Sequence, residues 1–241
     1  GFRMKAHRIA QRRFQKLKRR IRRRQQQARY QVHEDSPVIR GGNVRFEMAD
    51  KVRGISCGGI GAMHRLVERL GLQASIDSRL NLLKVHRPYS ESDHVLNMTY
   101  NLLCGGQRLE DIELRRNDEV FLDAIGADAL PDPTTAGDFC RRFGEPHIRL
   151  LMEAFDEARL QVWQQQSAEF FERADIQMDG SIVETTGQCK EGMSLSYKGI
   201  WGYHPLVVSL ANTQEVLRVR NRPSHEDAWY DVDESLLLCR K

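Results

Sequence analysis

The sequence lacks the cysteine pattern of a zinc ribbon or of a disulfide-stapled scaffold. Its 241 residues contain five cysteines, an odd number, and no C-x-x-C pair occurs among them. Because zinc ribbons use closely spaced cysteine pairs and secreted scaffolds use even numbers of cysteines, neither class is indicated. We expect a reduced, intracellular protein whose cysteines are small buried hydrophobic side chains. They are Cys57, Cys104, Cys140, Cys189 and Cys239.

Long apolar runs are also missing. No stretch approaches the ~18 apolar residues that cross a bilayer, and the sequence shows no signal-peptide core. We therefore expect a soluble, cytoplasmic protein without a membrane partner. Its length allows one large domain or two small ones, with enough residues for a hydrophobic core.

Acidic residues are absent from the first 30 positions, which hold 13 of the 37 lysines and arginines. The rest of the chain has 24 basic and 33 acidic residues, a net charge of −9. A basic arm is thus joined to a mildly acidic body, and such an arm favours a polyanion such as DNA. Seven clustered arginines are candidate phosphate contacts: Arg12, Arg13, Arg19, Arg20, Arg22, Arg23 and Arg24.

The arm has only a thin apolar stripe, formed by Phe14, Leu17 and Ile21 at helical spacing. Because the neighbouring arginines repel one another, this stripe is too narrow to stabilise an isolated helix. The sequence therefore predicts a mobile arm over residues 1–43 that becomes ordered on a polyanion. The alternatives are a disordered charged tail, or translated sequence upstream of the true start, since the sequence does not begin with Met.

Residues 44–168 have the apolar spacing of a helical region, which we expect to bind DNA or to support dimerisation. Ser90 and Asp93 form a capping pattern before one helix, and "PDPTT" supplies Asp132 or Thr134 as the N-cap of another. Expected helices cover about residues 60–70, 90–104, 109–125, 132–143 and 148–163.

The last two of these helices are joined by a Gly-x-Pro turn, within "DPTTAGDFCRRFGEPHIRL". A helix-turn-helix that faces DNA phosphates with Arg141, Arg142 and Arg149 is one interpretation. An ordinary helical hairpin with a solvated basic edge is the other, and the sequence leaves both open.

After Phe171 the apolar period changes from helical to alternating, so the chain as a whole predicts an α+β fold. A first strand, a second strand in "PLVVSLAN" and a third in "EVLRVRN" precede a helix that Ser224 is expected to cap. The tight turn at Asn212 predicts an antiparallel hairpin between the last two strands.

Asp179 stands inside the first of these strands, on the face that also carries Gln177 and Ser181. A carboxylate in mid-strand is costly to bury without a partner, and a bound metal ion is one such partner. Taken alone, the pattern favours an exposed or hydrogen-bonded structural aspartate, because charged residues mostly stay at the surface. Glu184 is a poor second ligand, because strand parity puts it on the opposite face.

The phrases "MDGSIVET" and "KEGMSLSYKGIWGYHPLVVSLANTQEVLRVRNRPSHE" resemble the start of the catalytic domain of insertion-sequence transposases, in the DDE-domain group. Upstream, "SESDHVLNMTYNLLCGGQRLEDIELRRND" and "PDPTTAGDFCRRF" resemble the helical N-terminal region of the same group. The resemblance covers roughly residues 44–241 and rests on several long, spaced phrases.

This resemblance implies an RNase H-like catalytic domain that starts near residue 169. Members of the group use two aspartates and a glutamate to hold two divalent ions, normally Mg²⁺ (or Mn²⁺), for phosphodiester cleavage and strand transfer. The first aspartate falls on Asp179. The second aspartate and the glutamate have no counterpart in this sequence, so we expect a truncated core, with three antiparallel strands and a helix over residues 169–241, that is inactive alone.

Other residues of the catalytic region are weaker candidates. Lys198, Tyr203 and His204 lie in the loop between the first two expected strands, where they could approach the scissile phosphate or a flipped DNA end. Alternatively, Tyr203 and Trp201 pack the loop and Lys198 is solvated. His225 is more typical of a helix-start or exposed residue than of a metal ligand.

The resemblance also implies partners: transposon inverted-repeat ends, target DNA and a second copy of the chain in a DNA-bound homodimer, in a nucleoid-associated setting. Two other functions stay open. One is a non-catalytic DNA-binding fragment that occupies transposon ends, and the other is an inactive remnant.

Overall fold

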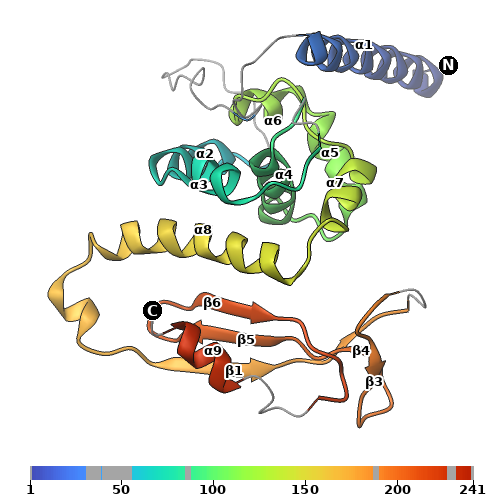
Figure 1. The fold of residues 1–241 in the computed structure, drawn as a ribbon. Helices are drawn as coiled ribbons and strands as arrows, with labels where there is room; N and C mark the ends of the chain where they lie inside the picture. The colour runs from blue at the N-terminus through green and yellow to red at the C-terminus, as the bar shows by residue number, and fades with distance from the viewer. Residues whose placement is uncertain are drawn as a thin grey trace. The chain divides into compact units, whose positions relative to one another are not determined.

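The structure, a computed structural model, describes residues 2–30, 39, 56–84, 88–186, 190–226 and 232–239. The side chains of residues 2–10, 12, 13, 28–30 and 238 are outside this description. The chain divides into two compact units, residues 1–161 and 162–241, shortly before the boundary expected at residue 169. Figure 1 shows the helices and strands of both units.

Residues Phe2–Tyr30 form one helix, α1, where the sequence predicted a mobile arm. Ile21 of its apolar stripe is 2% exposed and packs against the first core cluster of unit 1. Phe14 and Leu17 are exposed. The helix is therefore not isolated, because a distant part of unit 1 supplies the apolar contact that its own stripe is too narrow to provide.

Two ion pairs add to this contact. Arg20 Nη2 lies 2.8 Å from Glu119 Oε1, and Arg24 Nη1 lies 2.9 Å from Asp123 Oδ1. Both pairs repeat at one-turn spacing on each helix, so α1 is aligned along its acidic partner. Arg24 also donates to the carbonyl of Ala127.

The rest of unit 1 is helical, as the sequence predicted. Its elements are α2 (Ile60–Arg69), α3 (Leu72–Arg79), α4 (Glu91–Leu103), η1 (Leu109–Asp111), α5 (Ile112–Arg116), α6 (Glu119–Ala124), α7 (Pro133–Cys140) and most of α8 (Glu145–Trp163). The helix expected over residues 109–125 is broken in two, because the Asp118 side chain accepts from Val120 N and Phe121 N and starts α6 there.

The caps follow the sequence patterns. Asp93 Oδ2 accepts from Ser90 N at 2.9 Å and completes the capping box of α4. Asp132, rather than Thr134, is the N-cap of α7, since its Oδ1 accepts from Thr135 N at 2.9 Å. Pro133 then occupies the first helical position, where its missing N–H costs nothing.

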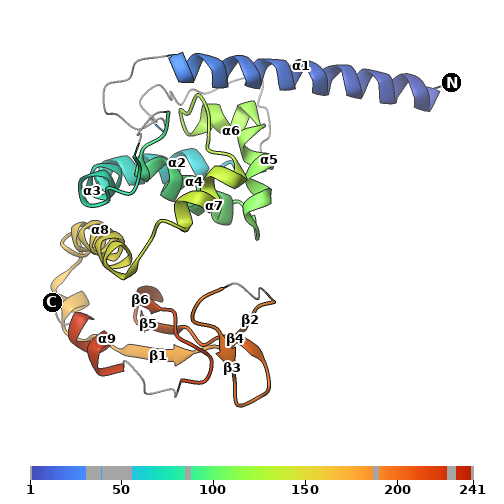
Figure 2. The ribbon, with the colours of Figure 1, turned by 45° about the vertical axis from the view of Figure 1, so that its right-hand side comes forward.

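Helix α4 lies in the middle of unit 1 (Figures 1 and 2), and it contributes side chains to both core clusters of the unit. Leu96 and Tyr100 pack in the cluster that receives Ile21. Val95 packs in the second cluster, with Phe139 of α7 and Ala154 of α8. The α7–α8 pair is thus held by burial of Phe139 against α4 and α8.

Unit 2 contains a sheet and a helix, so the chain is a mixed α+β protein. Three antiparallel strands lie in the order β1-β5-β6, and three very short strands form a second sheet in the order β2-β4-β3. The bounds are β1 (Ile176–Gly180), β2 (Val183–Glu184), β3 (Ser194–Leu195), β4 (Trp201–Tyr203), β5 (Leu206–Leu210), β6 (Glu215–Arg220), η2 (Ala168–Phe171) and α9 (Val232–Cys239).

The β5–β6 hairpin predicted from the turn at Asn212 is confirmed. Val232 and Leu236 of α9 pack against Leu206 and Val208 of β5, on one face of the sheet (Figures 1 and 2). The helix expected from Ser224 is not found there: residues 224–226 form a turn, and residues 227–231 are outside the described part.

The cysteines are less buried than expected: Cys57, Cys104 and Cys239 are half-buried, Cys140 is exposed, and Cys189 is outside the described residues. Among the described helices, none is both long enough and apolar enough to cross a membrane.

His94 gives unit 1 a pH-dependent stability. Its buried ring stacks on Phe139 with centroids 4.5 Å apart, and burial lowers its pKa from 6.5 to about 4. As the pH falls, His94 in the unfolded state therefore takes up a proton before His94 in the folded state does. The stability is complete above about pH 6.5 and is lost towards pH 4, by up to about 3 kcal/mol.

We predict that His94→Phe removes most of this loss. Urea unfolding at pH 7 and pH 4.5, followed through the helical circular dichroism signal, would measure the free energy of unfolding at each pH. The wild type should lose more stability between the two pH values than the variant, although buried His64, whose pKa is also lowered, acts in the same direction in both. Equal losses in the two proteins would contradict the assignment to His94.

Candidate catalytic carboxylate and DNA-contacting residues

Strand β1 places Asp179 on the sheet face away from α9. Met178 stands opposite Val208 in the β1–β5 register, and both belong to the core that α9 covers. Because successive side chains of a strand alternate, Asp179, which stands opposite Val207, points to the other face. Its side chain is exposed there, on the face the sequence predicted.

The residues that share this face are not metal ligands of the usual kind. They include Gln177 and Ser209, each two residues along its strand from the Asp179–Val207 pair, and exposed Val219 on β6. Glu184 lies in the separate β2-β4-β3 sheet and is also exposed. Within the described ranges, no group of three or more His, Cys, Asp or Glu side chains could hold a metal ion.

This donor set does not make a magnesium site by itself. Mg²⁺ requires near-octahedral oxygen coordination, and two-metal sites gather several carboxylates from different elements. Asp179 supplies one carboxylate. It is accessible to an ion, and the described residues provide no second carboxylate beside it.

The side chains of His204 and Arg222 pack against the end of β1, on the face opposite Asp179. A Cβ on Gly180 would lie 2.5 Å from His204 Nε2 and 2.9 Å from Arg222 Nη2, so a larger residue would require these two side chains to shift. Arg222 is buried and its Nε donates to the carbonyl of His204 at 3.0 Å. His204 N in turn donates to the carbonyl of Arg222 at 2.7 Å.

His204 therefore packs against the strand that carries Asp179 without sharing its face. The sequence singled out His204 but missed Arg222. No local pattern marks Arg222 as a core residue, because its burial follows from its contact with His204, 18 residues earlier in the chain.

Tyr203 and Lys198 lie on the β2-β4-β3 sheet and its turn. Tyr203 Oη donates to the carbonyl of Glu191 at 2.8 Å, which ties it into the loop. Lys198 Nζ stands 5.4 Å from the ring centroid of Tyr197, a cation–π distance. Trp201 is 47% exposed, so of the two aromatic residues expected to pack the loop, only Tyr203 is engaged.

His225 is exposed at the turn that precedes the undescribed segment. Its backbone N–H donates to Ser194 Oγ at 2.8 Å, and its ring lies 3.4 Å from the Glu226 carboxylate. This setting agrees with an exposed turn residue.

The basic edge of the α7–α8 pair is engaged within unit 1. Arg141 pairs with Asp138 at 2.5 Å, and Arg142 Nη1 donates to the carbonyl of Leu82 at 3.0 Å. Arg149 lies 3.4 Å from Glu145. A phosphate at this edge would have to compete with these contacts.

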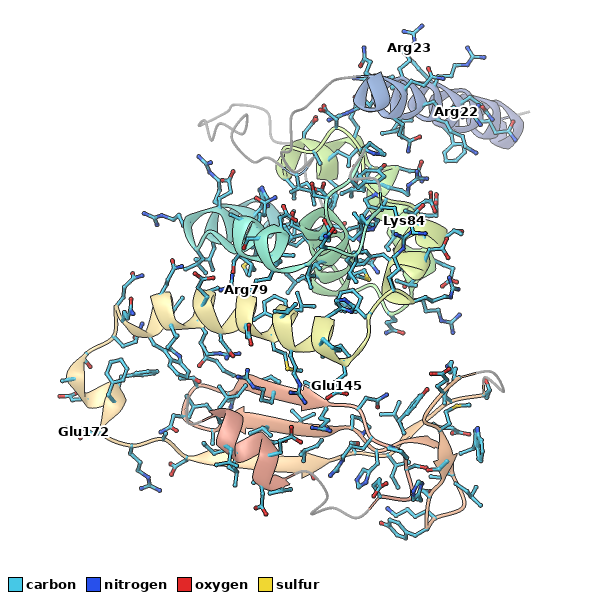
Figure 3. The ribbon with its side chains drawn as sticks, viewed as in Figure 1. Arg22, Arg23, Arg79, Lys84, Glu145 and Glu172 are labelled. Carbon is cyan, nitrogen blue, oxygen red and sulfur yellow. The ribbon has the colours of Figure 1, made fainter. Side chains whose placement is uncertain are left out.

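The cations of α1 divide into two groups. Arg20 and Arg24 form ion pairs with the acids of α6, and Arg19, Arg22 and Arg23, like Arg20, are exposed. Figure 3 shows Arg23 directed away from the helices of unit 1. The side chains of Arg12 and Arg13, the other two predicted contacts, lie outside the described part.

No protein-family model, curated protein or solved structure matches this chain.

Gly180 is predicted to be required for the close packing of β1 on His204 and Arg222. Gly180→Ala should destabilise unit 2 by about 1–3 kcal/mol, because the imidazole and the buried guanidinium would both have to shift to admit the methyl group. All three tryptophans lie in unit 2, so the shift of the urea unfolding midpoint in tryptophan fluorescence measures the change.

Ser181→Ala, one residue later at an exposed position that already carries a Cβ, is the matched control and should unfold like the wild type. A Gly180→Ala protein as stable as this control would show that the contact is not tight in solution.

Proposed function

We propose that this chain belongs to an insertion-sequence DNA transposase of the DDE group, which cleaves phosphodiester bonds and transfers strands at transposon ends. The observation that carries the proposal is the setting of Asp179. It stands in a strand of an antiparallel sheet, exposed on the face that the packed helix leaves open. The resemblance of "MDGSIVET" to the group's first catalytic strand supports the same residue.

Asp179 would contribute one ligand to Mg²⁺ or Mn²⁺, the ions that activate the nucleophile and stabilise the leaving oxygen in such reactions. The other two carboxylates of the group have no counterpart in this sequence. We therefore expect no strand transfer from these 241 residues alone. In the described part, β1 pairs only with β5, so its other edge is available for a further strand beside Asp179.

DNA binding is supported by the charge distribution on α1. Lys16, Arg19 and Arg23 follow one another at i, i+3 and i+7, which places them on one face of the helix. That face is opposite buried Ile21, because about 100° separates successive residues of a helix. The three cations are exposed, and such a row suits the phosphates of a duplex, with affinity that falls steeply with salt.

Two other functions remain compatible with these features. A DNA-binding protein that occupies transposon ends without cleaving them needs α1 and unit 1, and does not need Asp179. An inactive remnant needs neither. A homodimer on DNA and a nucleoid-associated location belong to the proposal as well.

Gel shifts of the full chain with inverted-repeat DNA and random duplex, at two salt concentrations, test the proposal. We expect tighter binding to the inverted repeat at both concentrations. The double variant Arg19→Ala/Arg23→Ala should weaken both complexes about equally. It should also reduce the slope of log affinity against log salt by about 0.9 for each phosphate that the variant no longer neutralises.

Arg69→Ala, which removes an exposed cation from α2, is the control and should leave the slope unchanged. Equal binding of both DNAs that disappears at moderate salt would rule out recognition of transposon ends. An unchanged slope in the double variant would rule out the α1 row as the phosphate contact.

A further inference from the structure

The β2-β4-β3 sheet has one apolar face. In its register, Val183 stands opposite Tyr203 and Leu195 stands opposite Trp201. Residues that stand opposite one another, or two apart on one strand, share a face. These four side chains therefore form one surface, the aromatic face, while Glu184 lies on the other side of the sheet with Ser194 and Gly202.

The other side of this sheet is covered by the turn that follows β6. Ser194 Oγ lies 3.2 Å from Ser224 Oγ and accepts from His225 N at 2.8 Å. Gly202, on the same side, is buried. The aromatic face is open by contrast: Leu195 is 57% exposed and Trp201 is 47% exposed.

A rigid turn joins β3 to β4 beside this face. Ser196 N donates to the carbonyl of Ile200 at 2.8 Å, and Gly199 N donates to the carbonyl of Ser196 at 2.9 Å. Gly199 has a φ of +73°, which favours glycine, and the buried Ser196 hydroxyl accepts from Ile200 N at 3.0 Å. Fixed in this way, the turn presents Tyr197, which is 83% exposed, with Lys198 at its ring.

We propose that the aromatic face and the Tyr197–Lys198 turn bind unpaired nucleotides at the end of a DNA substrate. Tyr197 and Trp201 offer rings on which bases stack, and Lys198 supplies a cation for the phosphate between them. This inference rests on the proposed function for its source of DNA. It assigns the small sheet to the unpaired part of the substrate and the basic row of α1 to the duplex.

Size and charge favour a nucleic acid over a protein partner. A stable protein interface uses about 20–30 residues on each side, far more than this sheet of two- and three-residue strands presents. A stacking site for one or two bases needs only a few rings and a nearby cation. Lys198 is the charged residue of the exposed turn, and Glu184 is turned to the opposite face of the sheet.

The test compares a flush duplex, the same duplex with a three-nucleotide thymidine overhang, and a thymidine oligonucleotide, each added to the full chain. Trp201 reports stacking directly through its fluorescence. We expect the overhang and the oligonucleotide to quench the wild-type emission, and Trp201→Phe to lose this quenching. The flush duplex should leave the emission nearly unchanged.

Affinity separates stacking from a merely structural role of the turn. Tyr197→Ala should weaken overhang binding about 5-fold or more, the effect of removing one base stack. Tyr197→Phe, which keeps the ring, should bind the overhang like the wild type. Both variants should bind the flush duplex unchanged.

Equal affinities for flush and overhang duplexes, with no quenching, would overturn this inference and leave the proposed DNA binding intact. Failure to bind any duplex, with quenching by the oligonucleotide retained, would contradict the proposed function and support the stacking site. A concentration-dependent change in Trp201 emission without DNA would mean that a second copy of the chain covers this face, and would also overturn the inference.

Discussion

The antiparallel pairing of β1 with β5 is the constraint on which the candidate site depends. It sets Met178 opposite Val208 under α9 and thereby turns Asp179 to the open face. A slip of one residue would exchange the two faces and bury the carboxylate in an apolar core, at a high free-energy cost. Gly180 suits this register, because a Cβ there would require His204 and Arg222 to shift.

Charged side chains likewise divide between those that hold packed elements together and those that lie on open surfaces. In unit 1, the acids of α6 hold Arg20 and Arg24 and so orient α1. The exposed cations then lie on the opposite side of the helix. The arginines of the α7–α8 pair, by contrast, are engaged by neighbours within the unit. We therefore propose that α1 binds duplex phosphates, that Asp179 binds a metal ion, and that the aromatic face binds unpaired bases.

Local patterns were enough to predict much of this fold. The alternation around Asp179, the hairpin at Asn212 and the caps at Asp93 and Asp132 are each set within a few residues, and the structure has them where the sequence indicated. The polar face that carries Asp179 could be predicted for the same reason.

What could not be predicted depends on contacts between distant segments. The α1 helix is stabilised by Ile21 and by acids some 100 positions away, so its own weak stripe suggested a mobile arm. The β2-β4-β3 sheet was missed because strands of two or three residues have no detectable period. In the sequence Arg222 resembles any exposed arginine, and it is buried only because the exit of β6 meets the turn at His204.

The role of Asp179 as a metal ligand is tested most directly by Mn²⁺ titration of the isotopically labelled full chain, followed in amide NMR spectra. If Asp179 binds the ion, paramagnetic broadening begins at the amides of Asp179, Val207 and Val219, and Asp179→Asn abolishes it. Broadening that is centred elsewhere, or that is unchanged in the variant, would contradict this role.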